Sequence, residues 1–203
     1  MSSPNLHIRT FSHLHIYPLV FPEEKDILVT NIVFHVPLRI IIVLQKELTI
    51  YTDGAARGNP GPGGYGVILM WGSSKKELSA GYRLTTNNRM ELMAVIKALE
   101  ALKRESLKIT IFSDSQYIVR AVSEGWLRKW LATGFKGGKK NKDLWMRYDE
   151  LASRHNIRFS WVRGHAENIY NNRCDELATA AADGTDLLID EGYEAENGVP
   201  DNL

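Results

Sequence analysis

Residues 48–71 read LTIYTDGAARGNPGPGGYGVILMW. Its first six residues alternate between apolar and polar side chains up to Asp53, a pattern typical of a half-buried β-strand. The glycines and prolines of residues 58–64 predict a turn, and the strand pattern resumes at Val67–Trp71. A glycine-rich turn between two strand patterns favours a hairpin, so we expect antiparallel strands with Asp53 at a strand end.

Strand and helix patterns alternate beyond this hairpin. Residues 78–84 continue the antiparallel sheet, whereas residues 108–113 and 157–162 are strand patterns that lie between helical ones. Strands that alternate with helices pair in parallel. The sequence therefore predicts an α/β domain with a mixed sheet and helices on both of its faces.

Four acidic residues lie at the predicted strand ends and helix starts: Asp53, Glu91, Asp114 and Asp175. Glu91 is expected in the first turn of a helix capped by Thr86 or Asn87, and Asp175 at the start of an alanine-rich helix. Asp114 follows one strand pattern and precedes a helix. A lone acid is most often a cap or a solvated charge. Because ligands of α/β sheets bind beyond the carboxyl ends of the strands, four such acids indicate a site.

Converging carboxylates favour a hard divalent cation. Mg²⁺ prefers oxygen ligands and keeps several waters, so a carboxylate site without His or Cys ligands indicates Mg²⁺, with Mn²⁺ as the alternative, over zinc. Two such ions about 4 Å apart are the usual device for in-line phosphodiester displacement. The four acids therefore predict metal-dependent phosphodiester chemistry.

Composition sets wider bounds. A chain of 203 residues with 44% hydrophobic content can bury one core. The single cysteine, Cys174, excludes an intramolecular disulfide and fits a reducing cytoplasm. Beside Asp175 on a predicted helix, Cys174 is expected to be a packed small residue rather than a nucleophile.

The net charge of +1 predicts no nucleic-acid partner by itself, but the charge is unevenly distributed. Seven basic residues lie from Trp126 to Arg147 against one acid, Asp143, whereas residues 183–203 hold seven acids and no Lys or Arg. Trp126 and Trp130 lie among the basic residues. Aromatic side chains beside cations suit stacking on bases or sugars while the charges neutralise phosphates. A solvated helix face is the alternative.

Several motifs together resemble those of the bacterial type 1 ribonucleases H. They are TDG (52–54) with GNPGPGGYG (58–66), TTNNRMEL (85–92), SDSQY (113–117), and WVRGHA (161–166) before NNRCDELA (171–178). The resemblance spans about residues 47–193, in the family's order and spacing. It implies a ribonuclease H-like fold with a mixed five-stranded sheet, and an endonuclease that hydrolyses the RNA strand of RNA–DNA hybrids.

The resemblance also implies a two-metal mechanism that leaves a 5′-phosphate and a 3′-hydroxyl. Asp53 would bridge the two Mg²⁺ ions. Glu91 and Asp114 would bind on one side of it and Asp175 on the other. His165 would transfer a proton to the leaving group or help product release, because an imidazole titrates near neutrality.

A second set of residues is implied to contact the substrate. RNA is told from DNA by its 2′-hydroxyl in the minor groove, and the side chains expected to line that groove are Asn59, Asn87, Asn88 and Gln116. Thr86 and Asn141 would hold a phosphate of the DNA strand. Trp126 and Trp130 would belong to a short basic protrusion that grips the same strand. Amide side chains are otherwise most often turn or cap residues.

Residues 1–45 are expected to form an N-terminal extension ahead of a catalytic domain, residues 46–203, that ends in an acidic tail. The apolar run of residues 32–44 is shorter than the roughly 20 residues of a membrane span, so no membrane partner is expected. A presequence, an extra structured element and translated upstream sequence are three interpretations. A dispensable or artefactual extension is favoured, because the resemblance begins only near residue 47.

Two other functions fit parts of the pattern. A non-catalytic hybrid-binding module would keep the basic segment and lose an acid, but all four acids are present. DNA-directed nucleases such as resolvases share the fold and the acids but lack the asparagine-rich groove motifs. We therefore expect a cytoplasmic enzyme that acts as a monomer on RNA–DNA hybrids.

Overall fold

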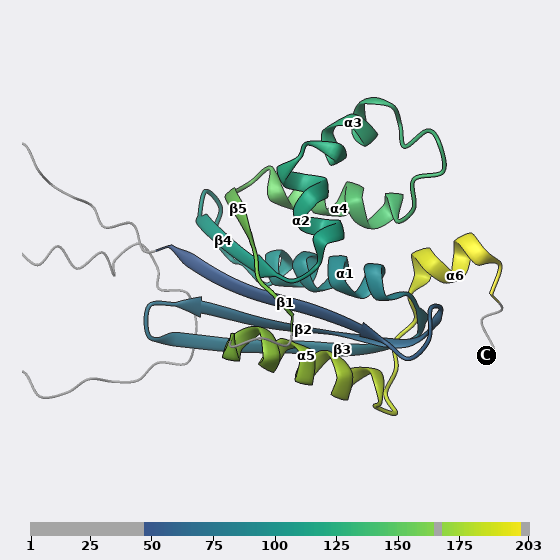
Figure 1. The fold of residues 1–203 in the computed structure, drawn as a ribbon, viewed down its shortest axis with the longest axis horizontal. Helices are drawn as coiled ribbons and strands as arrows, with labels where there is room; N and C mark the ends of the chain where they lie inside the picture. Colours follow the sequence, from purple (N-terminus) through teal and green to yellow (C-terminus); the bar gives the residue numbers. More distant parts are fainter. Residues whose placement is uncertain (1–46, 165–167, 200–203) are drawn as a thin grey trace, which may run out of the picture.

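The computed structural model describes residues 47–164 and 168–199, which form a five-stranded sheet with helices on both faces (Figure 1). The strands are β1 (Leu48–Ala56), β2 (Gly61–Trp71), β3 (Ser74–Thr85), β4 (Lys108–Ser113) and β5 (Asn156–Trp161). The helices are α1 (Asn87–Glu100), α2 (Gln116–Ser123), α3 (Trp126–Ala132), α4 (Lys142–Ala152), α5 (Ile169–Ala182) and α6 (Glu191–Asn197). The predicted α/β class with a mixed five-stranded sheet is confirmed. The expectations for residues 1–45 and for His165 lie outside the described residues.

The strand order β3-β2-β1-β4-β5 brings two of the predicted acids together. β2 is antiparallel to both of its neighbours, whereas β4 is parallel to β1 and to β5. In the parallel pairing, Thr52 on β1 is the partner of Ser113 on β4. The residues that follow them therefore lie close together, with Asp53 within β1 and Asp114 just beyond the end of β4.

The first hairpin is longer than its sequence indicates. β1 continues past Asp53 to Ala56, and β2 already begins at Gly61, so the predictions of a strand end at Asp53 and of a turn through residue 64 are wrong. The glycines of β2 allow close packing instead. A Cβ atom on Gly66 would lie 2.0 Å from the carbonyl oxygen of Cys174. Helix α5 therefore packs directly on β2, with Cys174 buried as predicted.

A different helix packs on each face of the sheet. α1 covers β1 and β2 on one face, and α5 covers β1, β2 and β3 on the other (Figure 1). Ile50 and Ile111 are fully buried, because alternate residues of β1 and β4 enter the core. On the other face, Tyr51 contacts the ring of Tyr170 at 5.0 Å, which fixes the start of α5 over β1. The two helices that carry Glu91 and Asp175 are thus held on opposite faces of β1.

The acidic C-terminal segment folds back onto the domain. Leu188 forms a parallel bridge with Tyr82 of β3, and α6 follows. Asp190 is 2% exposed and accepts hydrogen bonds from Nε and Nη2 of Arg89 at 2.7 and 2.6 Å. Glu194, also buried, accepts two from Arg83 at 2.9 and 2.5 Å. Buried acids are stable when paired in this way, so the segment that carries Asp190 and Glu194 is part of the packed structure.

Candidate active site

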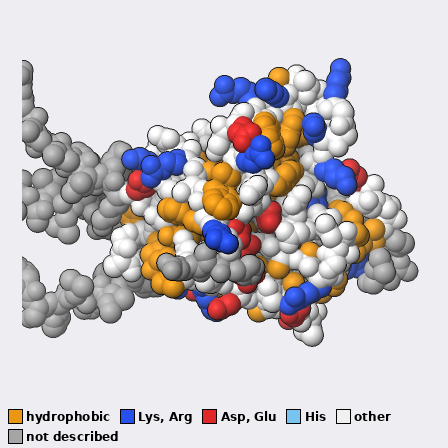
Figure 2. All heavy atoms as spheres, viewed as in Figure 1, with side chains coloured by type: hydrophobic (Ala, Val, Ile, Leu, Met, Phe, Trp, Pro, Cys, Tyr) orange, Lys and Arg blue, Asp and Glu red, His pale blue; other side chains and the backbone are white. Residues whose placement is uncertain are grey.

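The four predicted acids meet at one edge of the sheet. Asp53 lies on β1, Asp114 directly after β4, Glu91 on α1 and Asp175 on α5. The close approach of α1 to β1 depends on Gly54, because a Cβ atom there would lie 2.2 Å from the backbone nitrogen of Glu91. Figure 2 shows acidic side chains at the centre of this face of the molecule. The four acids are thus close enough for Glu91, Asp114 and Asp175 to act on the charge of Asp53, and their role as one functional site stays a prediction.

Glu91 lies deeper in α1 than predicted. It is the fifth residue of the helix, and the first turn holds no acid, so the prediction that Glu91 lies in the first turn is wrong. Thr86 is the N-cap, but its side chain makes no cap hydrogen bond. Instead, Asn59 Oδ1 accepts from the backbone nitrogen of Asn87 at 3.3 Å. The turn before β2 therefore provides the hydrogen-bond acceptor at the start of α1. A capping pattern in the neighbouring residues cannot predict it, because Asn59 is far from Asn87 in the sequence.

Asp175 is also farther along its helix than predicted. α5 begins at Ile169, and Asp175 is its seventh residue rather than its start. The cap is Asn168, whose Oδ1 accepts from the backbone nitrogens of Tyr170 and Asn171, both at 3.1 Å. The alanine-rich pattern predicted the helix but did not predict its polar first turn.

Burial and neighbouring charge both act on Asp53, which is 8% exposed. Burial, followed by repulsion from Asp114 and smaller contributions from Asp175 and Glu91, raises the pKa of Asp53 to about 8. The backbone nitrogen of Gly54 donates to Oδ1 at 2.7 Å and opposes this shift. A positive charge at this site would therefore favour the ionised form of Asp53.

Glu91 is held by two hydrogen bonds. Asn87 Nδ2 donates to Oε1 at 2.9 Å, and the Ser115 hydroxyl donates to Oε2. Burial raises the pKa of Glu91 to about 7, the charge of Asp114 adds to the shift, and the two donors oppose it. The sequence analysis predicted Asn87 as a groove residue but overlooked Ser115, which follows Asp114 directly and also caps α2.

Asn171 is a second residue that the sequence analysis missed. Its Nδ2 donates to Asp114 Oδ2 at 3.4 Å, and its side chain is 1% exposed. The available signal was its position four residues before Asp175, which places both on one face of α5. Its Oδ1 is buried and has no hydrogen-bond partner among the described residues. Asn171 thus connects the helix of Asp175 with the carboxylate of Asp114.

The donor set fits a hard divalent cation. The site offers carboxylate oxygens, and the raised pKa values of Asp53 and Glu91 show that a positive charge there would be stabilising. Within residues 47–164 and 168–199, however, no three His, Cys, Asp or Glu side chains are arranged to hold an ion by themselves. Mg²⁺ keeps several waters and often takes substrate phosphate oxygens as ligands, so such an ion would be shared between chain, water and substrate.

The raised pKa values predict a pH-dependent stability. The pKa values of Asp53 and Glu91 are about 8 and about 7, against 3.8 and 4.5 for the ordinary groups. The folded state therefore binds more protons than the unfolded chain in this window, and without metal the free energy of unfolding should fall as pH rises from about 4 to about 8. Urea unfolding in EDTA across this range measures the effect.

The Asp53→Asn variant isolates the contribution of Asp53. An amide keeps an oxygen for the Gly54 nitrogen but carries no charge, so the variant should be more stable than the wild type at pH 8, by up to about 5 kcal/mol for a pKa raised from 3.8 to about 8. The two proteins should differ little at pH 4.5, where the wild-type carboxyl is protonated in the folded state. Equal stabilities at both pH values would contradict the described electrostatics.

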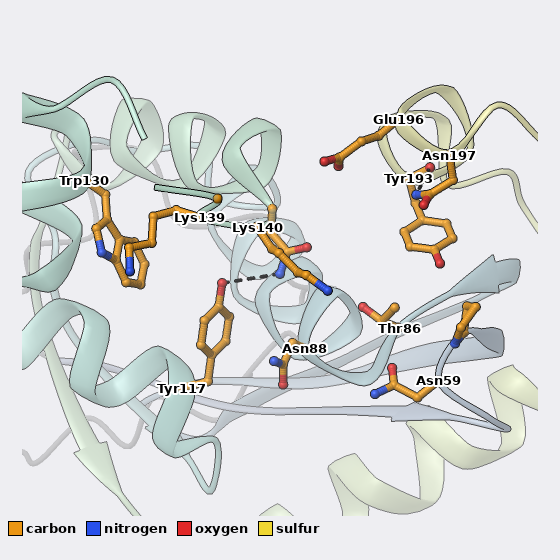
Figure 3. A pocket seen from close by; sticks show the side chains of 13 residues that line it. Asn59, Thr86, Asn88, Tyr117, Trp130, Lys139, Lys140, Tyr193, Glu196 and Asn197 are labelled. Atoms are coloured by element: carbon orange, nitrogen blue, oxygen red, sulfur yellow. Dashed lines mark hydrogen bonds between the residues drawn. The ribbon is translucent and has the colours of Figure 1, made fainter. Parts of the chain in front are cut away.

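A hollow of about 490 Å³ lies at the start of α1 (Figure 3). Five predicted substrate-binding residues line it: Asn59, Thr86, Asn88, Trp130 and Asn141. Lys139 and Lys140 lie on its rim. Asn141 is 9% exposed and donates from Nδ2 to the hydroxyl of Tyr117 at 3.3 Å. Amides, a hydroxyl and ammonium groups in one hollow can bind a phosphate.

The remaining predicted substrate-binding residues are not among those that line the hollow. Gln116 is exposed at the start of α2. Trp126 is half-buried, with its ring 6.3 Å from that of Trp130 and the Arg120 guanidinium 4.8 Å above it. Trp130 in turn packs on the buried Trp145 at 5.7 Å. The tryptophans thus support α3, and their contact with nucleic acid stays a prediction. Figure 2 shows Lys and Arg side chains gathered over α3 and the loop beyond it.

Known proteins are similar to this chain over most of its length. The chain matches the family model described as RNase H over residues 45–183. It is 58% identical over 153 residues to the Ribonuclease H of Syntrophus aciditrophicus, a match that covers 73% of this chain and 88% of that one. It is 50% identical over 157 residues to the Ribonuclease H of Pectobacterium carotovorum, which covers 75% of this chain and all of the relative.

Solved structures show the same similarity. The crystal structure of LC9-RNase H1, a type 1 RNase H with the type 2 active-site motif, superposes with a TM-score of 0.63 at 30% identity and covers 75% of this chain and 81% of that one. LC11-RNase H1 in complex with an RNA/DNA hybrid superposes with a TM-score of 0.52, also at 30% identity, and covers 68% and 97%. The family match includes β1 to α5, and α6 lies beyond it.

Proposed function

This chain belongs to the ribonuclease H family, and we propose that it is an endonuclease that hydrolyses the RNA strand of RNA–DNA hybrids, leaving 5′-phosphate and 3′-hydroxyl ends. The observation that carries the proposal is the meeting of four carboxylates, and a hollow lined by amides and lysines supports it. Support also comes from LC11-RNase H1, a similar chain whose structure contains an RNA/DNA hybrid.

Two Mg²⁺ ions fit the proposed reaction, with Mn²⁺ as the alternative. The side chains that would hold them are Asp53, Glu91, Asp114 and Asp175. When bound, the ions supply positive charge that activates the attacking water and stabilises the leaving 3′-oxygen. The chain itself orients the carboxylates. Ser115 and Asn87 fix Glu91, and Asn171 restrains Asp114.

Recognition of the hybrid is assigned to the polar side chains around α1. The 2′-hydroxyl of the RNA strand lies in the minor groove, where Asn59, Asn87, Asn88 and Gln116 would contact it. Thr86 and Asn141 would hold a phosphate of the DNA strand in the hollow, close to the two lysines on its rim. His165, outside the described residues, would transfer a proton to the leaving group.

The cysteine content and the chain's own acids bear on the cellular setting and the oligomeric state of the enzyme. The single cysteine is buried, and burial raises the pKa of its thiol, so it fits a packed residue in a reducing cytoplasm. A monomer would suffice, because all four acids come from one chain. None of the helices in residues 47–164 and 168–199 is long and apolar enough to span a membrane.

Cleavage assays with matched duplexes test the proposed function. An RNA–DNA hybrid should be cut in the presence of Mg²⁺ and left intact in EDTA. Duplex DNA and duplex RNA of the same sequence should resist, because one lacks the 2′-hydroxyls and the other lacks a DNA strand. Cleavage of duplex DNA at a comparable rate would favour a DNA-directed nuclease. Binding of the hybrid without cleavage in Mg²⁺ or Mn²⁺ would favour a non-catalytic module.

A further inference from the structure

Helix α6 contributes three of the residues that line the hollow: Tyr193, Glu196 and Asn197. The other lining residues come from the turn before β2, the start of α1, α2, α3, and the basic segment that joins α3 to α4. In Figure 3, the Tyr193 ring points from α6 toward Thr86 and Asn59, and the Glu196 carboxylate points toward the side of the lysines. The hollow is therefore enclosed on one side by a helix that lies beyond the family match.

The position of α6 is fixed by hydrogen bonds and ion pairs of buried side chains. Asp190 caps the helix, accepting from the backbone nitrogen of Tyr193 at 3.3 Å, while it is paired with the buried Arg89. The same arginine pairs with Asp143 at the start of α4. A Cβ atom on Gly192 would lie 2.0 Å from Asp143 Oδ2, so α6 and α4 are in direct contact. One arginine of α1 thus pairs with acids of both α4 and the α6 cap, which holds α6 in its position beside the hollow.

We propose that α6 forms one wall of the site for the DNA strand, with Tyr193 contacting that strand and Glu196 limiting its affinity. This inference rests on the proposed function, because it identifies further contacts of the same hybrid. Phosphate and sugar oxygens accept hydrogen bonds from tyrosine hydroxyls, and the apolar ring face can pack on a sugar or base. Asn197 Nδ2 donates to the carbonyl of Tyr193 at 2.8 Å and stabilises the last turn of the helix.

Glu196 acts in the opposite direction. Its carboxylate faces a hollow in which the other charged side chains are Lys139 and Lys140. A phosphate held by the lysines would be repelled by Glu196 across the hollow, which weakens binding. Substitutions of Tyr193 and Glu196 should therefore change the affinity in opposite directions. If α6 had only a structural role, every substitution in it would weaken binding.

The test measures hybrid affinity in EDTA and steady-state cleavage with Mg²⁺, using the full chain. Tyr193→Ala should weaken affinity and raise KM by about fivefold to tenfold, as expected for one hydrogen bond or partial stacking contact, with kcat unchanged. Tyr193→Phe should recover the part of the affinity that the ring provides. Glu196→Gln should tighten binding by about twofold to threefold at low salt.

Glu191→Gln is the matched control. It makes the same charge change on the same helix, but Glu191 is exposed and does not line the hollow, so its affinity should equal that of the wild type. A hybrid whose DNA strand is shortened until it no longer reaches the hollow should abolish the difference between Tyr193→Ala and wild type. Thermal unfolding of each variant identifies any loss of fold. If Tyr193→Ala is destabilised, Glu196→Gln still tests the proposal, because the Glu196 side chain is exposed and its replacement should not disturb the fold.

The outcomes are distinct. A wild-type protein that neither binds nor cuts the hybrid would overturn the proposed function itself. A wild-type protein that cuts the hybrid, together with Tyr193 and Glu196 variants that match it in affinity and KM, would overturn only the role of α6. An equal gain of affinity in Glu196→Gln and Glu191→Gln would show that only the net charge of the protein matters. That result would also overturn the proposed role of Glu196.

Discussion

Asp53→Asn is expected to lower the rate of hybrid cleavage by about three orders of magnitude or more, while hybrid affinity in EDTA stays equal to that of the wild type or rises. Asp53 lies between the other three acids, and each of them contributes to the raised pKa of its carboxyl. An amide of the same shape cannot supply the negative charge that divalent cations require. The loss should therefore appear in kcat, measured with saturating hybrid across a range of Mg²⁺ concentrations.

Asp149→Asn is the control for this variant. It makes the same chemical change on α4 at an exposed residue away from the carboxylates, so its activity should equal that of the wild type. The binding measurement shows that Asp53→Asn still folds and still recognises the hybrid. Substantial Mg²⁺-dependent cleavage by Asp53→Asn would remove Asp53 from the proposed ion site.

Arg89→Met is expected to produce the largest loss of stability. Arg89 is 1% exposed and pairs with Asp190 and Asp143, so its removal leaves a buried carboxylate without its cation. Breaking a buried pair from one side costs about 3–5 kcal/mol. For a domain of this size, the melting temperature should fall by roughly 6–20 °C. Thermal unfolding followed by circular dichroism at pH 7 measures the change.

Arg154→Met provides the comparison for this loss. Arg154 pairs with Glu150 on the surface, and exposed ion pairs contribute less than about 1 kcal/mol, so its melting temperature should change little. Arg89→Met with Asp190→Asn should be more stable than Arg89→Met alone, since the second change removes the unpaired charge. An unchanged melting temperature in Arg89→Met would show that the buried pairs do not hold α6 and α4 in place.

The sequence alone was sufficient for the architecture. Alternation in residues 48–53 and the later change to alternating strands and helices predicted the mixed sheet, and both depend on local periodicity that each segment carries by itself. The acids were identified for the same reason, because each lies within a short motif. The element boundaries were predicted less well. β1 extends to Ala56 because β2 pairs with it, and α5 begins at Ile169 because Asn168 caps it.

The tertiary structure alone decided what surrounds the acids. Ser115 and Asn171 have ordinary local roles in sequence, and they become partners of Glu91 and Asp114 only because segments far apart in the chain are packed together. The burial that raises the pKa of Asp53 likewise arises from elements on both faces of β1.

The C-terminal segment shows this division most clearly. By composition, residues 183–203 hold seven acids and no basic residue, which is the pattern of a solvated tail. Their cationic partners are supplied from distant positions, with Arg89 on α1 and Arg83 on β3. Periodicity and motifs are properties of neighbouring residues and can be read along the chain. Ion pairs between residues about a hundred positions apart depend on the completed fold, so only the structure could place Tyr193 in the hollow.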